Sequence, residues 1–164
     1  ATANTAIIAL GKIGTVPARE VIAALRRAAN PALAGAIAEA TLNVAGQLAA
    51  AGDSKAAATL VEPMLAPSQP IQMRRGALDA LLRLDQDGGE RRIMDVLRGP
   101  DGALRPVAIA AIPSLKSPKA SARFAAEIAK LTPNEQALML VALAHRGDPS
   151  ARAEIFAQLA AVVG

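Results

Sequence analysis

One short pattern recurs five times along the chain, and its spacing limits what the chain can fold into. Each copy is an alanine followed by an apolar residue or threonine; the alanines are Ala9, Ala40, Ala80, Ala111 and Ala142, spaced 31, 40, 31 and 31 residues apart. Another small or apolar residue lies three positions before each of these alanines, at Ala6, Ile37, Ala77, Ala108 and Met139. Spacings of three and four residues place side chains on one face of an α-helix. The pattern predicts five copies of one amphipathic helix, with a nine-residue insertion between the second and third copies.

A second helix is predicted after each copy of the first. Its apolar residues again follow helical spacing, and in the first such helix Val21, Leu25 and Ala28 are expected to face the core. The predicted ranges are roughly 17–29, 53–65, 89–98, 118–131 and 149–163. Phe124 and Phe156, which lie 32 residues apart in the last two of these ranges, are also expected in the core.

Capping residues mark several of the expected helix ends. The segment TPNE at 132–135 has the form of a capping box, in which Thr132 and Glu135 satisfy each other's backbone N–H groups. The segment GDP at 147–149 ends one helix on glycine and begins the next on Asp–Pro. Asn-Pro at 30–31 and Ser-Pro at 117–118 resemble a cap followed by a first-turn proline.

Composition agrees with a wholly helical fold. Of the 164 residues 52% are hydrophobic but only 1% are aromatic, and about a quarter are alanine, the best helix former. A single helix pair cannot bury its apolar face alone, whereas stacked pairs with short connections can. We therefore expect an all-α fold, a right-handed α-α superhelix (α-solenoid) of about five antiparallel helix pairs. It would form one domain over residues 1–164, either as a mature form or as a fragment of a longer protein.

The central part of the chain resembles HEAT repeats. Met73-Arg74 to Leu81 and Leu104-Arg105 to Ile112 match the pattern apolar-Arg-x-x-Ala-x-x-Ala-Leu of the short bacterial repeats first noted in phycobilisome lyases. LGKIG at 10–14 and LAHRGDP at 143–149 match the part of the repeat that follows this pattern. The chain departs from the pattern at Ala34 and Gln136, where arginine would stand. The resemblance implies that Arg74 and Arg105 support the turn between paired helices and are not a binding site.

Little in the sequence points to catalysis. The chain has no cysteine, and His145 is its only histidine, whereas a metal site needs several such ligands. The paired His–Glu motifs of iron-binding HEAT-like enzymes are missing, and without Trp or Tyr the chain lacks the aromatic residues of HEAT-like DNA glycosylases. No apolar run reaches the roughly 20 residues of a membrane span. We predict a protein without enzymatic activity, cofactor or metal.

The net charge of +4 raises the alternative of nucleic-acid binding. The excess lies in residues 102–134, which carry Arg105, Lys116, Lys119, Arg123 and Lys130 against Glu127 alone. This segment is a local basic patch in an otherwise balanced chain. Nucleic-acid binding through residues 102–134 is one alternative function, and an accessory role to an enzyme outside this segment is another.

The preferred hypothesis is a protein–protein interaction scaffold. In the HEAT family the helices with the Arg-Ala-Ala pattern line the concave face. Polar residues at helical spacing on these helices would then contact a protein partner, whose identity the sequence does not reveal. The candidate partner-binding residues are Asn43, Gln47, Arg75, Asp79, Arg83, Met139 and Arg146.

Overall fold

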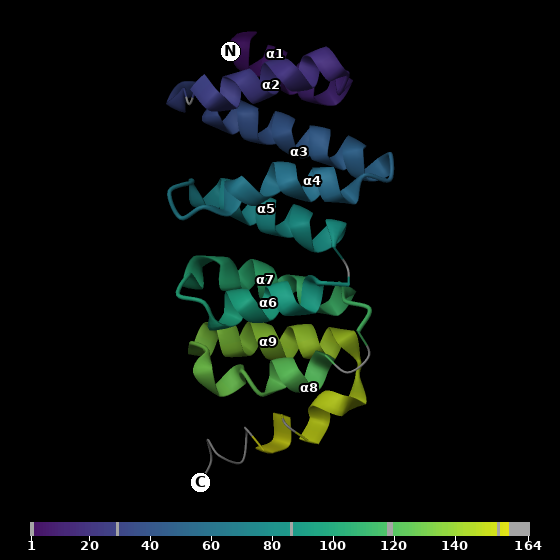
Figure 1. Ribbon diagram of the computed structural model, residues 1–164. Helices are drawn as coiled ribbons and strands as arrows, with labels where there is room; N and C mark the ends of the chain where they lie inside the picture. The colour runs from purple at the N-terminus through teal and green to yellow at the C-terminus, as the bar shows by residue number, and fades with distance from the viewer. Residues whose placement is uncertain (1, 29, 86, 118–119, 154, 158–164) are drawn as a thin grey trace. The chain divides into compact units, whose positions relative to one another are not determined.

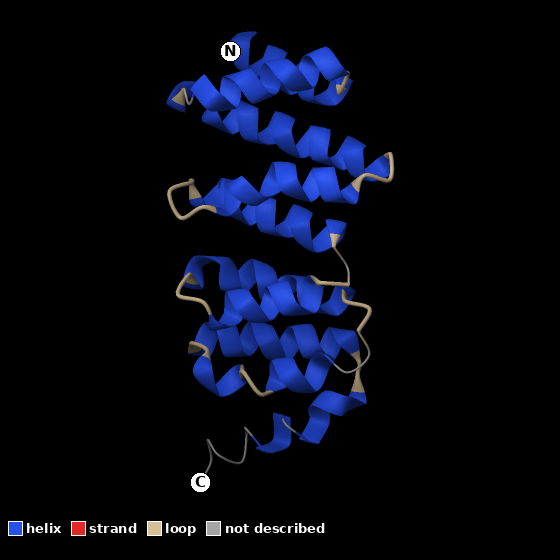
Figure 2. Cartoon of the chain, viewed as in Figure 1, coloured by secondary structure: helices blue, strands red, loops and turns tan. Residues whose placement is uncertain are grey.

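The computed structural model describes residues 2–28, 30–85, 87–117, 120–153 and 155–157. All regular structure in these residues is helical, and no strand occurs among them (Figure 2). The predicted all-α class is therefore confirmed. The chain divides into two compact units, residues 1–84 (unit 1) and residues 85–164 (unit 2). The single domain and the superhelical stacking of helix pairs stay predictions.

Unit 1 is built around one long central helix. Its α-helices are α1 (Thr2–Ile13), α2 (Val16–Ala28), α3 (Ala34–Ala50), α4 (Ser54–Val61) and α5 (Ile71–Leu84), with 3-10 turns η1 (Pro31–Leu33) and η2 (Glu62–Leu65). α3 contacts each of the other four helices (Figure 1). It has 17 residues, against 12 in α1 and 14 in α5, so part of the insertion in the second repeat lengthens this helix.

α1 and α3 approach each other closely at Gly11. Gly11 is buried against Ala40, and a Cβ atom at Gly11 would lie 2.5 Å from the Ala40 Cα and 2.8 Å from the Ala40 carbonyl oxygen. Such contacts leave no room for a side chain, so glycine is required here. The apolar core next to this contact includes Ile7, Ile37 and Val44.

The repeated positions are largely buried. Ala77 and Ala108 have no exposed surface, as expected for positions where helices pack closely. Ala80 and Ala111 are only partly buried, and Ala6 of the first copy is exposed. The spacing of three and four residues thus identifies the inward side of the central helices, but it does not distinguish fully buried from partly buried positions.

The inward face predicted for α2 is correct at Leu25, which packs against the core, and wrong at Val21 and Ala28. Val21 is 45% exposed and Ala28 is exposed, whereas Ala18 and Ile22 are buried. The line of buried residues therefore follows positions 18 and 22, and the next position along this line is 26, which is arginine. α2 is rotated because Ile22 enters the core that α1 and α3 form.

Unit 2 contains shorter helices joined by 3-10 turns. Its elements are α6 (Gly89–Arg98), η3 (Gly102–Leu104), α7 (Arg105–Ala111), η4 (Ile112–Ser114), α8 (Ala120–Ala125), η5 (Ile128–Lys130), α9 (Pro133–Arg146) and η6 (Pro149–Ala151). α7 packs against α6 and α9, and α8 packs against α9. α7 gives way to a 3-10 turn at Ile112 because Pro113 lacks the N–H group that a continuing helix needs.

The predicted caps are present wherever the structure describes them. The Thr132 hydroxyl accepts a hydrogen bond from the Glu135 backbone N–H, and the Glu135 carboxylate accepts one from the Thr132 backbone N–H, which completes the capping box. Gly147 ends α9 in the left-handed conformation, with a φ of 67°. Asn30 and Asp148 cap the 3-10 turns that follow them. Pro118 of the predicted Ser-Pro cap lies outside the described residues.

The two phenylalanines differ in burial. Phe124 is fully buried in α8, as predicted, but Phe156 is 70% exposed, so its prediction as a core residue is wrong. Phe156 follows η6 near the end of the described chain, and no described residue covers most of its ring. Among the described residues, no helix has both the length and the apolar character needed to cross a membrane.

Two buried carboxylates make unit 2 sensitive to acid. Hydrogen bonds from Arg98 and Lys130 to the Glu127 carboxylate lower its pKa despite burial. For Glu135, burial opposes ionisation, but the Thr132 N–H and hydroxyl groups and the charge of Arg105 lower the pKa overall.

Because these pKa values are lower in the folded state, the unfolded state binds more protons as the pH falls. The free energy of unfolding should therefore be steady near neutral pH and should fall progressively below about pH 4.5. Urea unfolding between pH 3 and pH 7 measures this loss. The Glu127→Gln variant should lose less stability over the same range, and an equal loss would contradict the role given to Glu127.

Candidate functional site

The predicted partner-binding residues of unit 1 lie on α3 and α5. Arg83 and Asp79 form an ion pair one helical turn apart, and their side chains are 72% and 48% exposed. Asn43 and Arg75 are partly buried, and the Asn43 Nδ2 and Arg75 Nε atoms have almost no contact with solvent. We name these four residues the α3–α5 strip. Its Asp79–Arg83 end is the part most available to a partner, and the role of the strip in binding stays a prediction.

Gln47 has a structural task that the sequence did not reveal. Its side-chain amide Nε2 donates to the Gly11 carbonyl oxygen at 3.1 Å and to the Lys12 carbonyl oxygen at 2.7 Å. Carbonyl groups at the end of a helix lack partners within that helix. Gln47 therefore caps the end of α1 from α3.

The Gln47→Ala substitution should lower the free energy of unfolding by about 1 kcal/mol, since it removes these two hydrogen bonds. Chemical denaturation followed by circular dichroism measures the change. Asn43→Ala, one turn earlier on α3, is the matched control and should have little effect because no partner is found for the Asn43 Nδ2 atom. Equal losses in both variants would contradict the capping role of Gln47.

Two predicted binding residues of unit 2 are corrected by the structure. Met139 has no exposed surface, because it occupies the repeat position of Ala77 and Ala108 in the core. The Arg146 side chain is only 7% exposed. Its Nη1 atom donates to the Ile112 and Leu115 carbonyl oxygens at 3.0 and 2.7 Å. Met139 and Arg146 therefore stabilise unit 2 and do not line a partner-binding surface.

Other arginines also hold the connections between helices. The Arg105 Nη2 atom donates to the Gly99 carbonyl oxygen at 3.0 Å, in the connection between α6 and α7. The Arg19 Nε atom donates to the Gly14 carbonyl oxygen at 2.8 Å, in the connection between α1 and α2. Arg74 is 8% exposed. The contact of Arg105 agrees with its predicted support of the turn between paired helices, and the same role of Arg74 stays a prediction.

The basic segment 102–134 is less positive in the folded protein than in the sequence. Arg123 pairs with Glu90 at 2.6 Å, and Lys130 pairs with Glu127 at 3.0 Å. Arg105 lies 3.7 Å from Glu135. Lys116 is exposed, and Lys119 lies outside the described residues. Because carboxylates face three of the five cations, the structure does not favour a nucleic-acid interface here.

A concave surface of unit 1 lies between α2 and α4, above α3. It consists of two adjoining cavities of about 510 and 730 Å³, which we name together the α2–α4 groove. Ala23 and Arg26 of α2 and Pro63 of η2 line both cavities. The floor is α3, and the remaining walls come from α4, η2 and the start of α5. Apolar side chains provide much of the lining, among them Ile37, Val44, Leu48, Leu60, Met64 and Met73.

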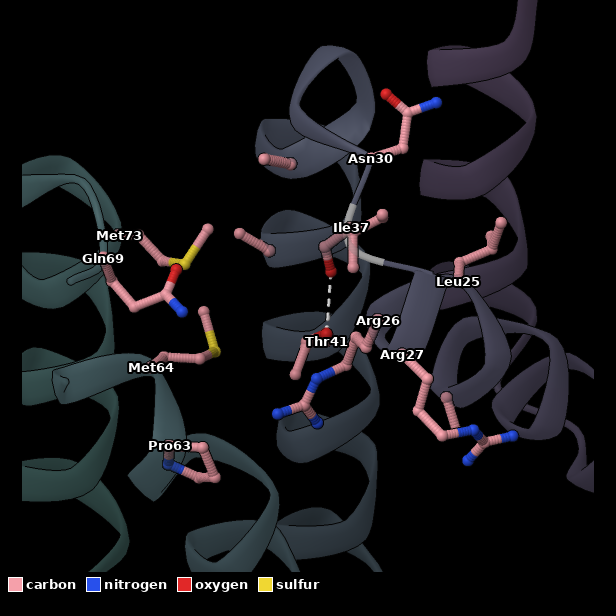
Figure 3. Close-up of a pocket in the computed structure, with 13 residues that line it drawn as sticks. Leu25, Arg26, Arg27, Asn30, Ile37, Thr41, Pro63, Met64, Gln69 and Met73 are labelled. Carbon is pink, nitrogen blue, oxygen red and sulfur yellow. Dashed lines mark hydrogen bonds between the residues drawn. The ribbon is translucent and has the colours of Figure 1, made fainter.

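Arg26 stands where the two cavities meet. In Figure 3 its guanidinium reaches across α3 beside Thr41 and toward Pro63, whereas Arg27 points away from this region. Burial lowers the pKa of Arg26 from the ordinary value of arginine. Among the described residues no carboxylate pairs with Arg26, and its side chain makes no hydrogen bond. The Thr41 hydroxyl, its neighbour, donates to the Ile37 carbonyl oxygen at 2.7 Å.

Sequence reasoning missed Arg26, although a signal was present. In α4 and α6 two buried apolar residues lie four positions apart, at Ala57 and Val61 and at Ile93 and Leu97. In α2 the buried Ile22 is followed four positions later by arginine. α2 has the same spacing at Ala18 and Ile22, and Arg26 lies one turn beyond this pair. The signal was thus an arginine that continues the line of buried residues of α2.

A comparable cavity in unit 2 has a different electrostatic character. It lies between α6 and α8, has a volume of about 530 Å³, and is lined by charged residues of both helices. Arg98 pairs with Glu127 at 2.6 Å, and Arg123 pairs with Glu90 at 2.6 Å. These two arginines are thus satisfied within the protein, in contrast to Arg26.

Comparisons with known proteins do not assign this chain to a family. No family model matches it, and no significant match was found among curated proteins or solved structures. The resemblance to HEAT repeats therefore stays a prediction from sequence. The functional argument depends on the α2–α4 groove and on the α3–α5 strip.

Proposed function

We propose that this protein is a non-enzymatic interaction module that holds a segment of a partner protein in the α2–α4 groove. The observation that carries the proposal is the groove itself, with an apolar floor and walls and a combined size sufficient for several side chains. Burial of apolar side chains is the main source of affinity in such grooves. A HEAT-like α-solenoid is the architecture that we propose for the whole chain.

The lining also supports binding more than catalysis. The groove has no histidine or cysteine among its described lining residues, and the Thr41 and Thr59 hydroxyls donate to the backbone carbonyl oxygens of Ile37 and Lys55. Among the described residues no group of three metal-ligating side chains comes together. Met64 and Met73 can adapt to differently shaped apolar side chains, because methionine is unbranched and flexible. This adaptability suits recognition of a protein segment.

A random peptide library displayed on phage tests the proposal with the full chain as bait. Ala23→Trp fills the groove, because Ala23 lines both of its cavities. Ala24→Trp is the matched control, since the neighbouring Ala24 is exposed and lines neither cavity. Wild type and Ala24→Trp should enrich the same peptides, and Ala23→Trp should lose them. Thermal unfolding must show that both variants are folded.

The α3–α5 strip provides the competing outcome. If the α3–α5 strip is the binding surface, Arg83→Glu should abolish enrichment and Ala23→Trp should keep it. That result would overturn the proposal for the groove while leaving a protein-binding role in place. No enrichment by the wild-type chain would overturn both.

A further inference from the structure

Arg26 is costly to the free protein as it stands. Transfer of a charged group from water to apolar surroundings is unfavourable unless the charge is paired. Arginine cannot escape this cost by losing its proton, because its pKa is too high. Arg26 nevertheless lies partly buried in the groove, one turn beyond the buried Ile22, and no described carboxylate pairs with it.

The part of the groove around Arg26 is positive and lined mainly by apolar residues. The cavity of about 510 Å³ is lined by Arg26, Arg27 and no carboxylate among the described residues. Glu20 and Asp53 line the other cavity, and the Asp53 carboxylate already accepts a hydrogen bond from the Ala56 N–H. An occupant that brought a carboxylate to Arg26 would form a charge-assisted hydrogen bond in a partly desolvated site, where such bonds are strong.

We infer that the α2–α4 groove recognises an amphipathic protein segment in which an aspartate or glutamate, flanked by apolar residues, pairs with Arg26. This inference rests on the proposed function and adds the chemistry of the partner. The apolar side chains of the segment lie against Ile37, Met64 and Leu60, and its carboxylate meets the guanidinium where the two cavities join. The complementary charge distinguishes this segment from a purely apolar one.

The pairing predicts a specific peptide preference. Wild-type protein should select library peptides with an acidic residue flanked by leucine, isoleucine, methionine or phenylalanine. Arg26→Met should still bind apolar peptides but should lose the acidic preference, since methionine keeps an unbranched aliphatic chain without the charge. Arg152→Met is the control and should select as wild type does, because Arg152 is exposed and lines neither cavity of the groove.

The peptide itself provides the reciprocal test. For a selected peptide, replacing its acidic residue by the uncharged amide should weaken binding to wild-type protein at least tenfold. The same replacement should change binding to Arg26→Met by less than twofold. This double-mutant cycle isolates the pairing from the apolar contacts. Equal tenfold losses in both proteins would overturn the pairing with Arg26.

The free protein offers a readout that needs no partner. Arg26→Met should raise the melting temperature by up to about 2 °C, because it removes an unpaired charge from a partly buried position. Arg27→Met should leave the melting temperature unchanged. A lower melting temperature for Arg26→Met would mean that Arg26 stabilises the free protein, and it would overturn the inference.

The outcomes separate this inference from the proposed function. If the enriched peptides are apolar without a preferred acidic residue, and if Ala23→Trp loses them, the groove remains a binding site. That result would overturn the role of Arg26. The absence of any groove-dependent peptide would overturn both. Saturable binding of dodecanoate without peptide enrichment would assign the groove to a lipid carboxylate and would overturn the protein partner.

Discussion

Replacement of Gly11 by alanine should destabilise the protein by about 1–3 kcal/mol, although alanine is the better helix former. The helix propensity of alanine alone would stabilise α1 by about 1 kcal/mol. The contact with α3 outweighs this gain, because the added Cβ atom would lie 2.5 Å from the Ala40 Cα. The contacted atoms belong to the backbone, so α1 and α3 must move apart, and the surrounding core loses its close packing.

Gly46 provides the matched control for this prediction. It lies within α3, and no heavy atom is found within 4 Å of the position that its Cβ would take. Gly46→Ala should therefore raise the free energy of unfolding by about 0.5–1 kcal/mol. If the contact is as close as the structure shows, urea unfolding should give a lower free energy of unfolding for Gly11→Ala and a higher one for Gly46→Ala. Stabilisation by Gly11→Ala would mean that α1 and α3 do not meet at this point.

Ala108→Phe should be the most damaging substitution in the central repeat. Ala108 has no exposed surface, and its helix α7 packs between α6 and α9 within unit 2. A phenylalanine there has no space, and overpacking a core costs about 1–3 kcal/mol or more. The expected consequence is a clear loss of thermal stability.

Ala103→Phe is the comparison variant for Ala108→Phe. Ala103 is exposed in η3, only five residues earlier, and a large side chain there can extend into solvent. Its thermal unfolding should remain close to that of the wild type. If Ala103→Phe proved the more harmful of the two, the repeat alignment would be wrong, and with it the placement of Arg75, Asp79 and Arg83.

Tertiary contacts assign different roles to residues that look equivalent in the sequence. Asn43 and Gln47 lie one turn apart on α3 and appear in the sequence as one polar stripe. Only the packing of α1 on α3 brings the carbonyl oxygen of Gly11 within 3.1 Å of Gln47, which lies 36 residues away in the chain. A local pattern contains no information about such a partner.

The sequence by itself determined the helical class, the inward positions of the central repeats and the caps. Each of these depends on local chemistry, such as the spacing that buries Ala77 and Ala108 or the pairing of Thr132 with Glu135. The rotation of α2 was decided only in the tertiary structure. Alanine and valine are tolerated on either side of a helix, so an alanine-rich segment is apolar on several faces and its spacing permits more than one rotation. Packing against α1 and α3 selected the rotation that buries Ile22, and this same rotation placed Arg26 in the groove.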